Sequence, residues 1–439
     1  MPSSLPSSPS RIAIVLAGGA ARGAYEVGIL SYLFDEVARS LGAPIPLDIL
    51  CGTSVGAINA CALAAAADDP RRGVATLLDA WRSLQLAELV KANAGEIASL
   101  VRNFVSPRAV PKSAAAAELR RGGVLDPAGI ERVVRQHIAF DRIQDHVKNG
   151  KLSALTVTTT DVATGRTVIF VQHGHRSLPV WSRDPTILVR EAQMQPAHAL
   201  ASAAVPFLFP AVRIGDEFHC DGGLRQNVPL SPARRLGAEG LLVINPRYIG
   251  PSMHAPPPVV NGVVQPHFPG PLSLAGKALN ALLLDRIDND ISRLHRINDI
   301  LEAGVRRYGP TFVDEINDEI SLAKRHVASD KGLPPPPNVE FRPLNVVHVR
   351  ASVDIGAAAG AYVRSADFAA RAPAVTGRLL RRVADWAGDD DSDLLSYVLF
   401  DGEFAARLIE VGRGDAAARH EELCALFAPR VGTRRLNPS

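Results

Sequence analysis

The sequence contains few cysteines, and they form no metal-binding or disulfide pattern. Four cysteines occur in 439 residues. No two of them form a C-x-x-C pair, so neither a zinc cluster nor a disulfide framework is expected. Cys51 and Cys61 lie in apolar stretches, which is typical of small buried side chains. We therefore expect no metal site and no cofactor, and the cysteine usage favours a reducing compartment.

The chain also lacks a long apolar run, a signal peptide and a strong net charge. The longest apolar stretch, residues 60–67, is far shorter than the roughly 20 residues of a membrane span. Residues 1–10 have neither a basic nor an apolar region, so they predict a disordered terminus and not a signal peptide. A net charge of +3 argues against a nucleic-acid partner. We expect a cytoplasmic protein, and the sequence is compatible with a peripheral contact at a membrane surface.

What is present is the material of a large α/β core, because 47% of the residues are hydrophobic and 21% are charged. Residues 11–17 and 47–51 predict two buried strands, and residues 27–41 between them predict an amphipathic helix. This order is typical of a βαβ unit with a parallel sheet. Further strands are expected in pairs at 152–161 with 167–172 and at 211–214 with 217–220, and singly at 240–245 and 344–349. Helices are expected over most of 71–140, 191–204, 272–308 and the remainder to about 427.

These patterns predict an α/β fold with a mostly parallel sheet flanked by helices and an α-rich C-terminal extension. The expected organisation is a disordered N-terminus (1–10), a catalytic domain (11–250), a proline-rich loop (251–271) and a mostly helical C-terminal region (272–439). The sequence of that last region shows no chemistry. It contains an acidic run ending at Asp393, which is interpreted as a solvated helix start.

The most informative motif is the pentapeptide Gly52-Thr53-Ser54-Val55-Gly56, which lies between a predicted strand and a predicted helix. Two glycines allow a sharp strand-to-helix turn that presents the serine hydroxyl at its crest. The amide of the residue after the serine and the start of the helix then face any negative charge that forms there. The motif predicts a nucleophile; the alternative is a tight turn whose serine merely caps the helix.

A glycine-rich loop, Gly18-Gly19-Ala20-Ala21-Arg22-Gly23, follows the first predicted strand. Small residues leave backbone amides uncovered, so the loop could hold an oxyanion. It does not match a P-loop, because Ala-Tyr follows Gly23 where a P-loop has Lys-Ser/Thr. Its glycine spacing does not match a dinucleotide fingerprint either. A plain structural turn is the remaining alternative.

A base for the serine is harder to find. His348 and His219 fall in predicted strands and His198 in a predicted helix, so each is interpreted as an ordinary histidine. Asp221 is a better candidate because it ends a short strand and is followed by Gly222 and Gly223, which leave it exposed on a turn. Alone, such an aspartate more often bonds its own backbone.

Together these segments resemble the patatin-like phospholipase family. The match rests on residues 16–25, on 52–57 and on Asp221-Gly222-Gly223, with support from residues 201–206 and 227–229. The resemblance implies a three-layer α/β/α fold and a Ser-Asp dyad, with Ser54 as the nucleophile and Asp221 as the base. It also implies that the loop from Gly18 to Gly23 forms the oxyanion hole, with Gly18, Gly19, Ala20 and Val55 contributing amides.

The sequence departs from the family pattern at Ala20, where the family loop usually has its third glycine. If this position requires a positive φ, alanine costs about 1 kcal/mol there. Arg22 carries the fixed charge of the loop; it either supports the loop or attracts an anionic head group, and the structural role is preferred.

The leading hypothesis is a serine lipid acyl hydrolase, a carboxylic ester hydrolase acting on a phospholipid, lysophospholipid or acylglycerol through an acyl-enzyme. Residues 205–209 are candidates for lining an acyl channel. One alternative is a transacylase that passes the same acyl group to an alcohol or thiol. The other is a non-catalytic scaffold that retains the fold, for which Ala20 is the sole support.

Overall fold

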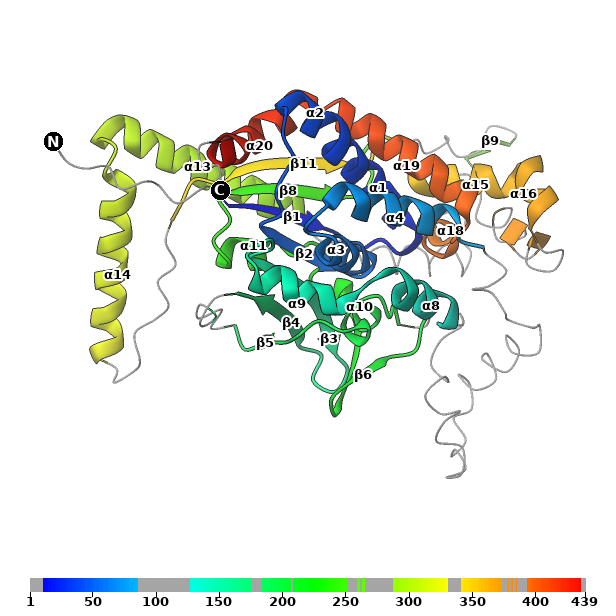
Figure 1. Cartoon of the computed structure of the whole chain (residues 1–439), viewed down its shortest axis with the longest axis horizontal. Helices are drawn as coiled ribbons and strands as arrows, with labels where there is room; N and C mark the ends of the chain where they lie inside the picture. The colour runs from blue at the N-terminus through cyan, green and yellow to red at the C-terminus, as the bar shows by residue number, and fades with distance from the viewer. Residues whose placement is uncertain are drawn as a thin grey trace.

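A nine-stranded sheet lies at the centre of the computed structural model, with helices on both of its faces (Figure 1). Its main path runs in the order β11-β8-β1-β2-β3-β4-β5, and β7 and β6 attach beside β3. The structure describes residues 11–85, 127–174, 178, 184–206, 208–250, 259–260, 263–264, 287–330, 341–372, 377–378, 380–381, 384 and 393–435. A separate short pair is formed by β9 (Val259–Val260) and β10 (Val263–Val264).

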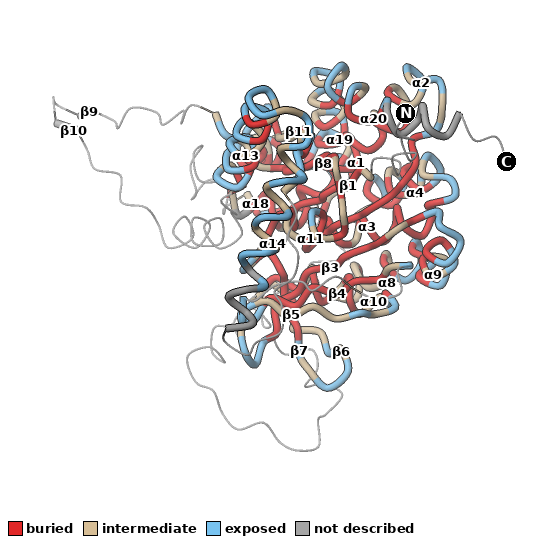
Figure 2. Tube along the Cα trace, turned by 90° about the vertical axis from the view of Figure 1, so that its left-hand side faces the viewer, coloured by how far each residue is buried: buried red, intermediate tan, exposed pale blue. Residues whose placement is uncertain are grey.

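Five neighbouring strands of the sheet run parallel: β11 (Asn345–Arg350), β8 (Gly240–Asn245), β1 (Ile12–Leu16), β2 (Ile49–Thr53) and β3 (Ala154–Asp161). β1, β2, β3 and β8 are buried along their whole length. Figure 2 shows this burial at the labels β1, β3 and β8. Strands covered on both faces are apolar without alternation, and for this reason the sequence pattern found them. The sheet predicted from the sequence is therefore confirmed.

The remaining strands make the far edge of the sheet mixed. β4 (Thr167–His173) is antiparallel to β3, and β5 (Ile187–Glu191) is parallel to β4. β6 (Val212–Ile214) and β7 (Glu217–Asp221) form the predicted hairpin, and β7 pairs antiparallel with β3. β5 was not predicted, and the helix predicted from residue 191 is wrong at its start, because Glu191 ends this strand.

Helices complete the layers. In the first half of the chain these are α1 (Gly23–Tyr32), continued by a π-helical turn and α2 (Ala38–Leu41), then α3 (Val55–Ala65), α4 (Pro70–Arg82), α8 (Ala128–His137), α9 (Phe140–Lys148), α10 (Pro196–Ser202) and α11 (Leu230–Arg235). Pro196 occupies the first turn of α10, where its missing amide hydrogen is no loss. Part of the helical prediction for 71–140 lies at residues 86–126, outside the described residues.

The second half of the chain adds α13 (Ile287–Tyr308), α14 (Phe312–Asp330), α15 (Ile355–Arg364), α16 (Ala366–Arg371), α18 (Asp393–Val398), α19 (Gly402–Ala417) and α20 (His420–Arg435). The predicted residues 1–10, most of the proline-rich loop 251–271 and residues 272–286 lie outside the described residues. The domain boundaries expected from the sequence stay a prediction.

The C-terminal region packs directly onto the first βαβ unit. β11 extends the sheet beside β8, and α19 lies along α1 (Figure 1). The two helices are so close that a Cβ on Gly28 would come within 2.1 Å of the Ile409 carbonyl oxygen. Glycine is required where backbones approach in this way. The C-terminal region therefore completes the core of the fold.

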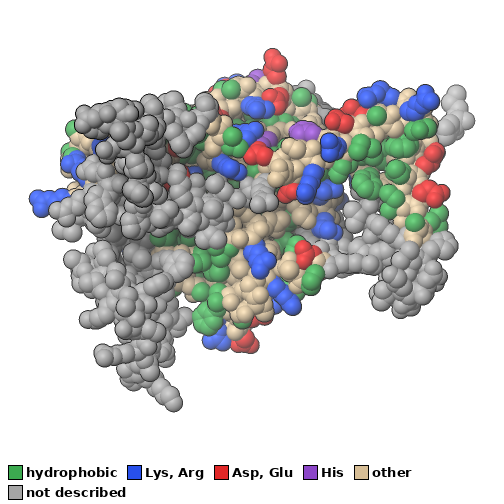
Figure 3. Space-filling view, turned by 180° about the vertical axis from the view of Figure 1, so that it is seen from behind, with side chains coloured by type: hydrophobic (Ala, Val, Ile, Leu, Met, Phe, Trp, Pro, Cys, Tyr) green, Lys and Arg blue, Asp and Glu red, His purple; other side chains and the backbone are tan. Residues whose placement is uncertain are grey.

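α13 and α14 project from the body (Figure 1) and carry exposed apolar side chains. Ile300, Tyr308 and Leu322 are 58%, 71% and 49% exposed. Seen from behind, hydrophobic side chains gather over this part of the molecule, while charged side chains of both signs are interspersed elsewhere (Figure 3). Within the described residues, no helix is both long and apolar enough to cross a bilayer.

Candidate active site

Ser54 lies at a sharp turn between β2 and α3. Its backbone has φ 55° and ψ −130°, a combination that a non-glycine residue rarely adopts. The glycines on either side allow close approach: a Cβ on Gly52 would lie 2.5 Å from the Ala57 Cα, and one on Gly56 would lie 2.5 Å from the Leu16 carbonyl oxygen. The local geometry is that of a nucleophile elbow.

The sheet brings Asp221 to the same point from the opposite direction. Both β2 and β7 pair with the same edge of β3, where Thr53 is opposite Thr158 and Asp221 is opposite Thr159. The last residue of β2 and the last residue of β7 therefore lie next to each other along β3. Ser54, the next residue after β2, donates from Oγ to Oδ2 of Asp221 at 2.6 Å.

Asp221 is fully buried. Its second carboxylate oxygen, Oδ1, accepts a hydrogen bond of 2.6 Å from the Gly223 amide, and its carbonyl oxygen accepts one from Thr160 Oγ1. Burial raises the pKa of the Asp221 carboxyl from 3.8 to about 7, although the bonds from Ser54 and Gly223 lower it. A carboxylate with such a pKa is a much better match for a hydroxyl proton than an exposed aspartate.

Ser202 links the turn at Ser54 to β3 through two hydrogen bonds. Its hydroxyl accepts a hydrogen bond of 2.8 Å from the Ser54 amide and donates one of 2.6 Å to the Thr158 carbonyl. Ser202 is completely buried, so these bonds form without competition from water. The sequence pattern drew attention to residues 201–206 but assigned Ser202 no role, because only the folded chain brings the end of α10 next to Ser54.

The glycine-rich loop turns beside the elbow. In the described part of the chain, the amides of Gly19, Ala20 and Val55 donate to no other group, so they are free to face a developing negative charge. Gly18 differs from the prediction, because its amide donates to the Asn227 carbonyl at 3.1 Å. The Asn227 side chain returns a bond to the Gly18 carbonyl at 3.2 Å. Gly18 therefore fixes the turn and offers no amide to an oxyanion.

Ala20 has φ 48°, so the departure from the family pattern falls at a position with a left-handed backbone. We expect Ala20→Gly to increase the free energy of unfolding by about 0.5–1 kcal/mol, because relief of strain outweighs the extra freedom that glycine gives the unfolded chain. The matched control is Ala21→Gly, at a buried neighbour without a positive φ, which should destabilise. Urea denaturation of both variants measures the two effects, and a loss of stability in Ala20→Gly would contradict this account.

None of the three histidines considered as bases is hydrogen-bonded to Ser54, whose hydroxyl bonds Asp221 instead. His198 accepts from the Gln195 amide at the start of α10, His219 is buried against Thr159, and His348 lies in β11. Burial lowers the pKa of both His198 and His348 to about 4. Among the described residues, no group of three or more His, Cys, Asp or Glu side chains is arranged to hold a metal ion.

With this geometry in place, the chain can be compared with known proteins. The family model for patatin-like phospholipases matches residues 14–234. The chain belongs to the patatin-like phospholipase family. The matched region contains the elbow, the glycine-rich loop and Asp221 of this patatin-like chain.

A curated relative is the cGAMP-activated phospholipase of Pseudomonas aeruginosa (strain BWHPSA011 / Pa011), which is 28% identical over 223 residues. The match covers 50% of this chain and 55% of the relative, so the patatin-like chain aligns with about half the length of that protein. Two solved structures were also compared. VipD from Legionella pneumophila is 11% identical with a TM-score of 0.28, and it covers 91% of this chain and 92% of its own. The ExoU–SpcU heterodimer from Pseudomonas aeruginosa is 17% identical with a TM-score of 0.23 and covers 89% and 69%.

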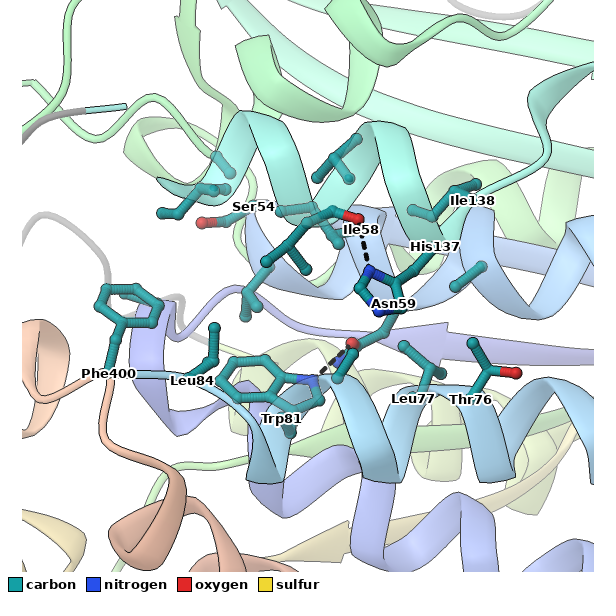
Figure 4. A pocket seen from close by; sticks show the side chains of 18 of the residues that line it. Ser54, Ile58, Asn59, Thr76, Leu77, Trp81, Leu84, His137, Ile138 and Phe400 are labelled. Carbon is teal, nitrogen blue, oxygen red and sulfur yellow. Dashed lines mark hydrogen bonds between the residues drawn. The ribbon is translucent and has the colours of Figure 1, made fainter. Parts of the chain in front are cut away.

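An apolar pocket opens beside Ser54 of the patatin-like fold (Figure 4). It encloses about 70 Å³, and apolar side chains of α3, α4 and α8 form most of its walls. Trp81 forms one wall; its ring nitrogen donates to Asn59 Oδ1 at 3.2 Å, so its polar atom is satisfied. Ser54 and Phe400 lie towards one end and Thr76 and Ile138 towards the other. Phe209, from the segment expected to line an acyl channel, is part of the wall.

Arg22 and Gly23 anchor the glycine-rich loop to its surroundings. The Gly23 carbonyl accepts from Asn59 Nδ2 at 3.2 Å. The Arg22 side chain is buried and forms an ion pair of 3.0 Å with Asp393. Asp393 belongs to α18, for which the sequence suggested no partner, because nothing local links two residues so far apart in the chain.

Proposed function

We propose that the protein is a serine lipid acyl hydrolase that uses Ser54 and Asp221 as a catalytic dyad. The observation that carries the proposal is the 2.6 Å contact between Ser54 Oγ and a fully buried carboxylate whose pKa is about 7. Membership in the patatin-like phospholipase family implies a lipid hydrolase and supports the same reaction class. A serine at a plain structural turn needs no such partner.

In the first step, Ser54 Oγ attacks the ester carbonyl carbon while its proton passes to Asp221 Oδ2. The carbonyl oxygen becomes negatively charged and is held by the amides of Gly19, Ala20 and Val55 at the start of α3. Collapse of this intermediate breaks the bond to the leaving alcohol, which takes the proton from Asp221. The products of the step are an acyl-serine ester and a free alcohol.

In the second step, water enters in place of the alcohol. Asp221 accepts a proton from the water as its oxygen attacks the acyl-serine carbonyl, and the same amides hold the oxyanion. The proton then returns to Ser54 Oγ as the acyl bond breaks, which releases a fatty acid. Proton transfer accompanies attack, so Asp221 need not be a strong base.

The pocket beside Ser54 and a groove that adjoins it support a lipid substrate. The apolar pocket suits an acyl chain because it offers few polar groups. A second groove of about 340 Å³ shares Ile130, Ala203 and Phe209 with it, and Arg135 and Arg213 lie among its lining residues. We propose that the rest of the lipid occupies this groove, with the arginines near an anionic head group. Contact with a membrane surface fits the exposed apolar side chains of α13 and α14.

The pocket predicts an acyl-length effect. Ser54, Ile58 and Ala62 follow one another at four-residue steps on one face of α3, so Ala62 lies about 12 Å from Ser54 along the helix axis. We expect Ala62→Phe to lower kcat/KM for a palmitoyl ester by about tenfold or more and to leave a butyryl ester within about threefold. The control is Ala75→Phe, at an exposed position of α4. Equal losses for both esters in Ala62→Phe would contradict the placement of the acyl chain.

The proposed reaction is tested with a fluorophosphonate probe, which modifies an activated serine. The wild type should be labelled on the peptide that contains Ser54, and Ser54→Ala should not be labelled. Labelling without ester hydrolysis in water, followed by ester formation when an acceptor alcohol is added, would indicate the transacylase instead. Absence of both labelling and turnover with all three lipid classes would favour the non-catalytic scaffold.

A further inference from the structure

The C-terminal helix α18 is attached directly to the glycine-rich loop through Arg22. Arg22 Nε donates to Ser396 Oγ at 2.8 Å, and its terminal nitrogen donates to Asp393 Oδ1 at 3.0 Å. The guanidinium carbon lies 4.1 Å from the centroid of the Tyr397 ring. Arg22, Ser396 and Tyr397 are each no more than 5% exposed. The guanidinium is thus held by an ion pair, a hydrogen bond and an aromatic face at once.

The groups that bind Arg22 are themselves held in place. Ser396 Oγ also donates to the Asp393 carbonyl at 2.6 Å, which fixes the hydroxyl that accepts from Arg22. A guanidinium that bonds a carboxylate and a hydroxyl and also lies over an aromatic ring has little conformational freedom left. Because Arg22 is buried, removing one of its partners leaves the guanidinium with little compensation from water.

The segment that follows α18 is attached to the acyl pocket. Phe400 lines this pocket beside Ser54, and its ring stacks on Trp81 at 6.4 Å between centroids with 14° between planes. The Gly402 amide donates to the carbonyl of Leu84, two residues after α4, at 2.9 Å. Residues 393–402 therefore contact the loop at one end and the pocket at the other.

The loop itself has a conformation that needs support. Ala20 has a positive φ, and such a backbone persists only when its surroundings determine it. Asn227 fixes the loop at Gly18, two residues before Ala20, and Arg22 is two residues after it. On the C-terminal side of the strained residue, the contacts of Arg22 with α18 add to the bond between Asn59 and the Gly23 carbonyl.

We propose that α18 is a component of the active site, in which Asp393 and Ser396 are positioning residues that act through Arg22. They hold the loop so that the amides of Gly19 and Ala20 face the oxyanion, while Phe400 closes the acyl pocket. The inference rests on the proposed hydrolase function and assigns the C-terminal region a role in the rate of the reaction.

The test compares Asp393→Ala, Asp393→Asn and Ser396→Ala with the wild type in ester hydrolysis. A displaced oxyanion loop affects the transition state more than the bound substrate, so Asp393→Ala should lower kcat about 10- to 100-fold with KM within about twofold. Asp393→Asn keeps an acceptor oxygen and should recover part of the loss. The matched control is Asp367→Asn, which removes an exposed carboxylate paired with Arg407 in the same region and should leave kcat unchanged.

A double-mutant cycle separates positioning from general destabilisation. If Asp393 acts through Arg22, Arg22→Met combined with Asp393→Ala should be no slower than Arg22→Met alone. Losses that multiply in the double variant would overturn the proposal. So would a kcat within twofold of the wild type in Asp393→Ala.

Hydrogen exchange provides a readout that does not depend on turnover. Amides in the peptide 17–24 should exchange at least about tenfold faster in Asp393→Ala, while peptides of β1 and β8 keep their protection. If exchange in 17–24 does not change, the contact with α18 does not hold the loop, and this conclusion stands even if the protein is inactive. Fast exchange with no labelling of the wild type by the fluorophosphonate would instead show that the loop contact exists and that the hydrolase proposal fails.

Discussion

Ser54→Ala is expected to lower kcat for ester hydrolysis by at least about four orders of magnitude, because the acyl-enzyme can no longer form. The buried Asp221 carboxylate then loses the hydroxyl donor at 2.6 Å and keeps the Gly223 amide. What activity remains comes from the oxyanion hole and substrate binding alone. Initial rates with a chromogenic ester, together with loss of fluorophosphonate labelling, measure this effect.

Ser54→Gly should be equally inactive but more stable than Ser54→Ala. The position has φ 55° and ψ −130°, which alanine tolerates poorly and glycine readily. We expect the free energy of unfolding of Ser54→Gly to exceed that of Ser54→Ala by about 1–2 kcal/mol. At exposed Ala75 in α4, in contrast, a change to glycine should destabilise by about 1 kcal/mol. If glycine is less stable than alanine at position 54, as we expect at position 75, then position 54 is not strained.

Asp221→Asn is expected to lower kcat about a thousandfold at pH 8 and, at the same pH, to make the protein more stable. The rate falls because asparagine cannot accept the serine proton, and general bases contribute about 10² to 10⁴. Stability rises because the variant buries no charge. In the wild type, kcat/KM should fall about tenfold per pH unit below about pH 7, where Asp221 becomes protonated.

The stability effect has a definite pH dependence. The pKa of Asp221 is raised in the folded protein, to about 7 from 3.8, so the folded state binds this proton more tightly than the unfolded state does. The favourable contribution of the proton is complete below about pH 4 and is lost as the pH rises through 7. The shift in pKa lowers the free energy of unfolding by about 4 kcal/mol at most between these two pH values. Asp221→Asn should therefore match the wild type near pH 4 and exceed it at pH 8.

Exposed Asp216 supplies the control for both measurements, because Asp216→Asn should change neither the rate profile nor the pH dependence of stability. Two results would contradict the assignment of Asp221 as the base. One is a rate that is constant from pH 5 to 9, and the other is an Asp221→Asn variant with the turnover of the wild type.

Local patterns in the sequence were sufficient for the central sheet and for the separate parts of the site. The elbow at Ser54 and the turn at Asp221 each have a local signature of glycines after a strand. Their contact does not, because it depends on β2 and β7 sharing one edge of β3. The family resemblance supplied the pairing that the residues alone left open.

The errors have physical causes. β5 (Ile187–Glu191) was missed because this edge strand is only partly buried, so it lacks the continuous apolar pattern of the central strands. The role of Asp393 was missed because an acidic residue at a helix start is usually explained by the helix dipole. Arg22, the partner of Asp393, is 371 positions away, and only the folded chain brings the two residues together.

The order of strands has a consequence for protein synthesis. β1 lies between β2 and β8, so residues 12–16 have one neighbour once residues 49–53 have been made, and the other only after residues 240–245. β8 in turn gains its outer neighbour, β11, only after residues 345–350 have been made. The Arg22 contact requires residues 393–396 as well. During translation, at about 5–20 residues per second, the nascent chain would carry its serine for many seconds before the loop is secured. We therefore expect fragments that terminate before position 393 to carry an intact serine motif and to hydrolyse esters poorly.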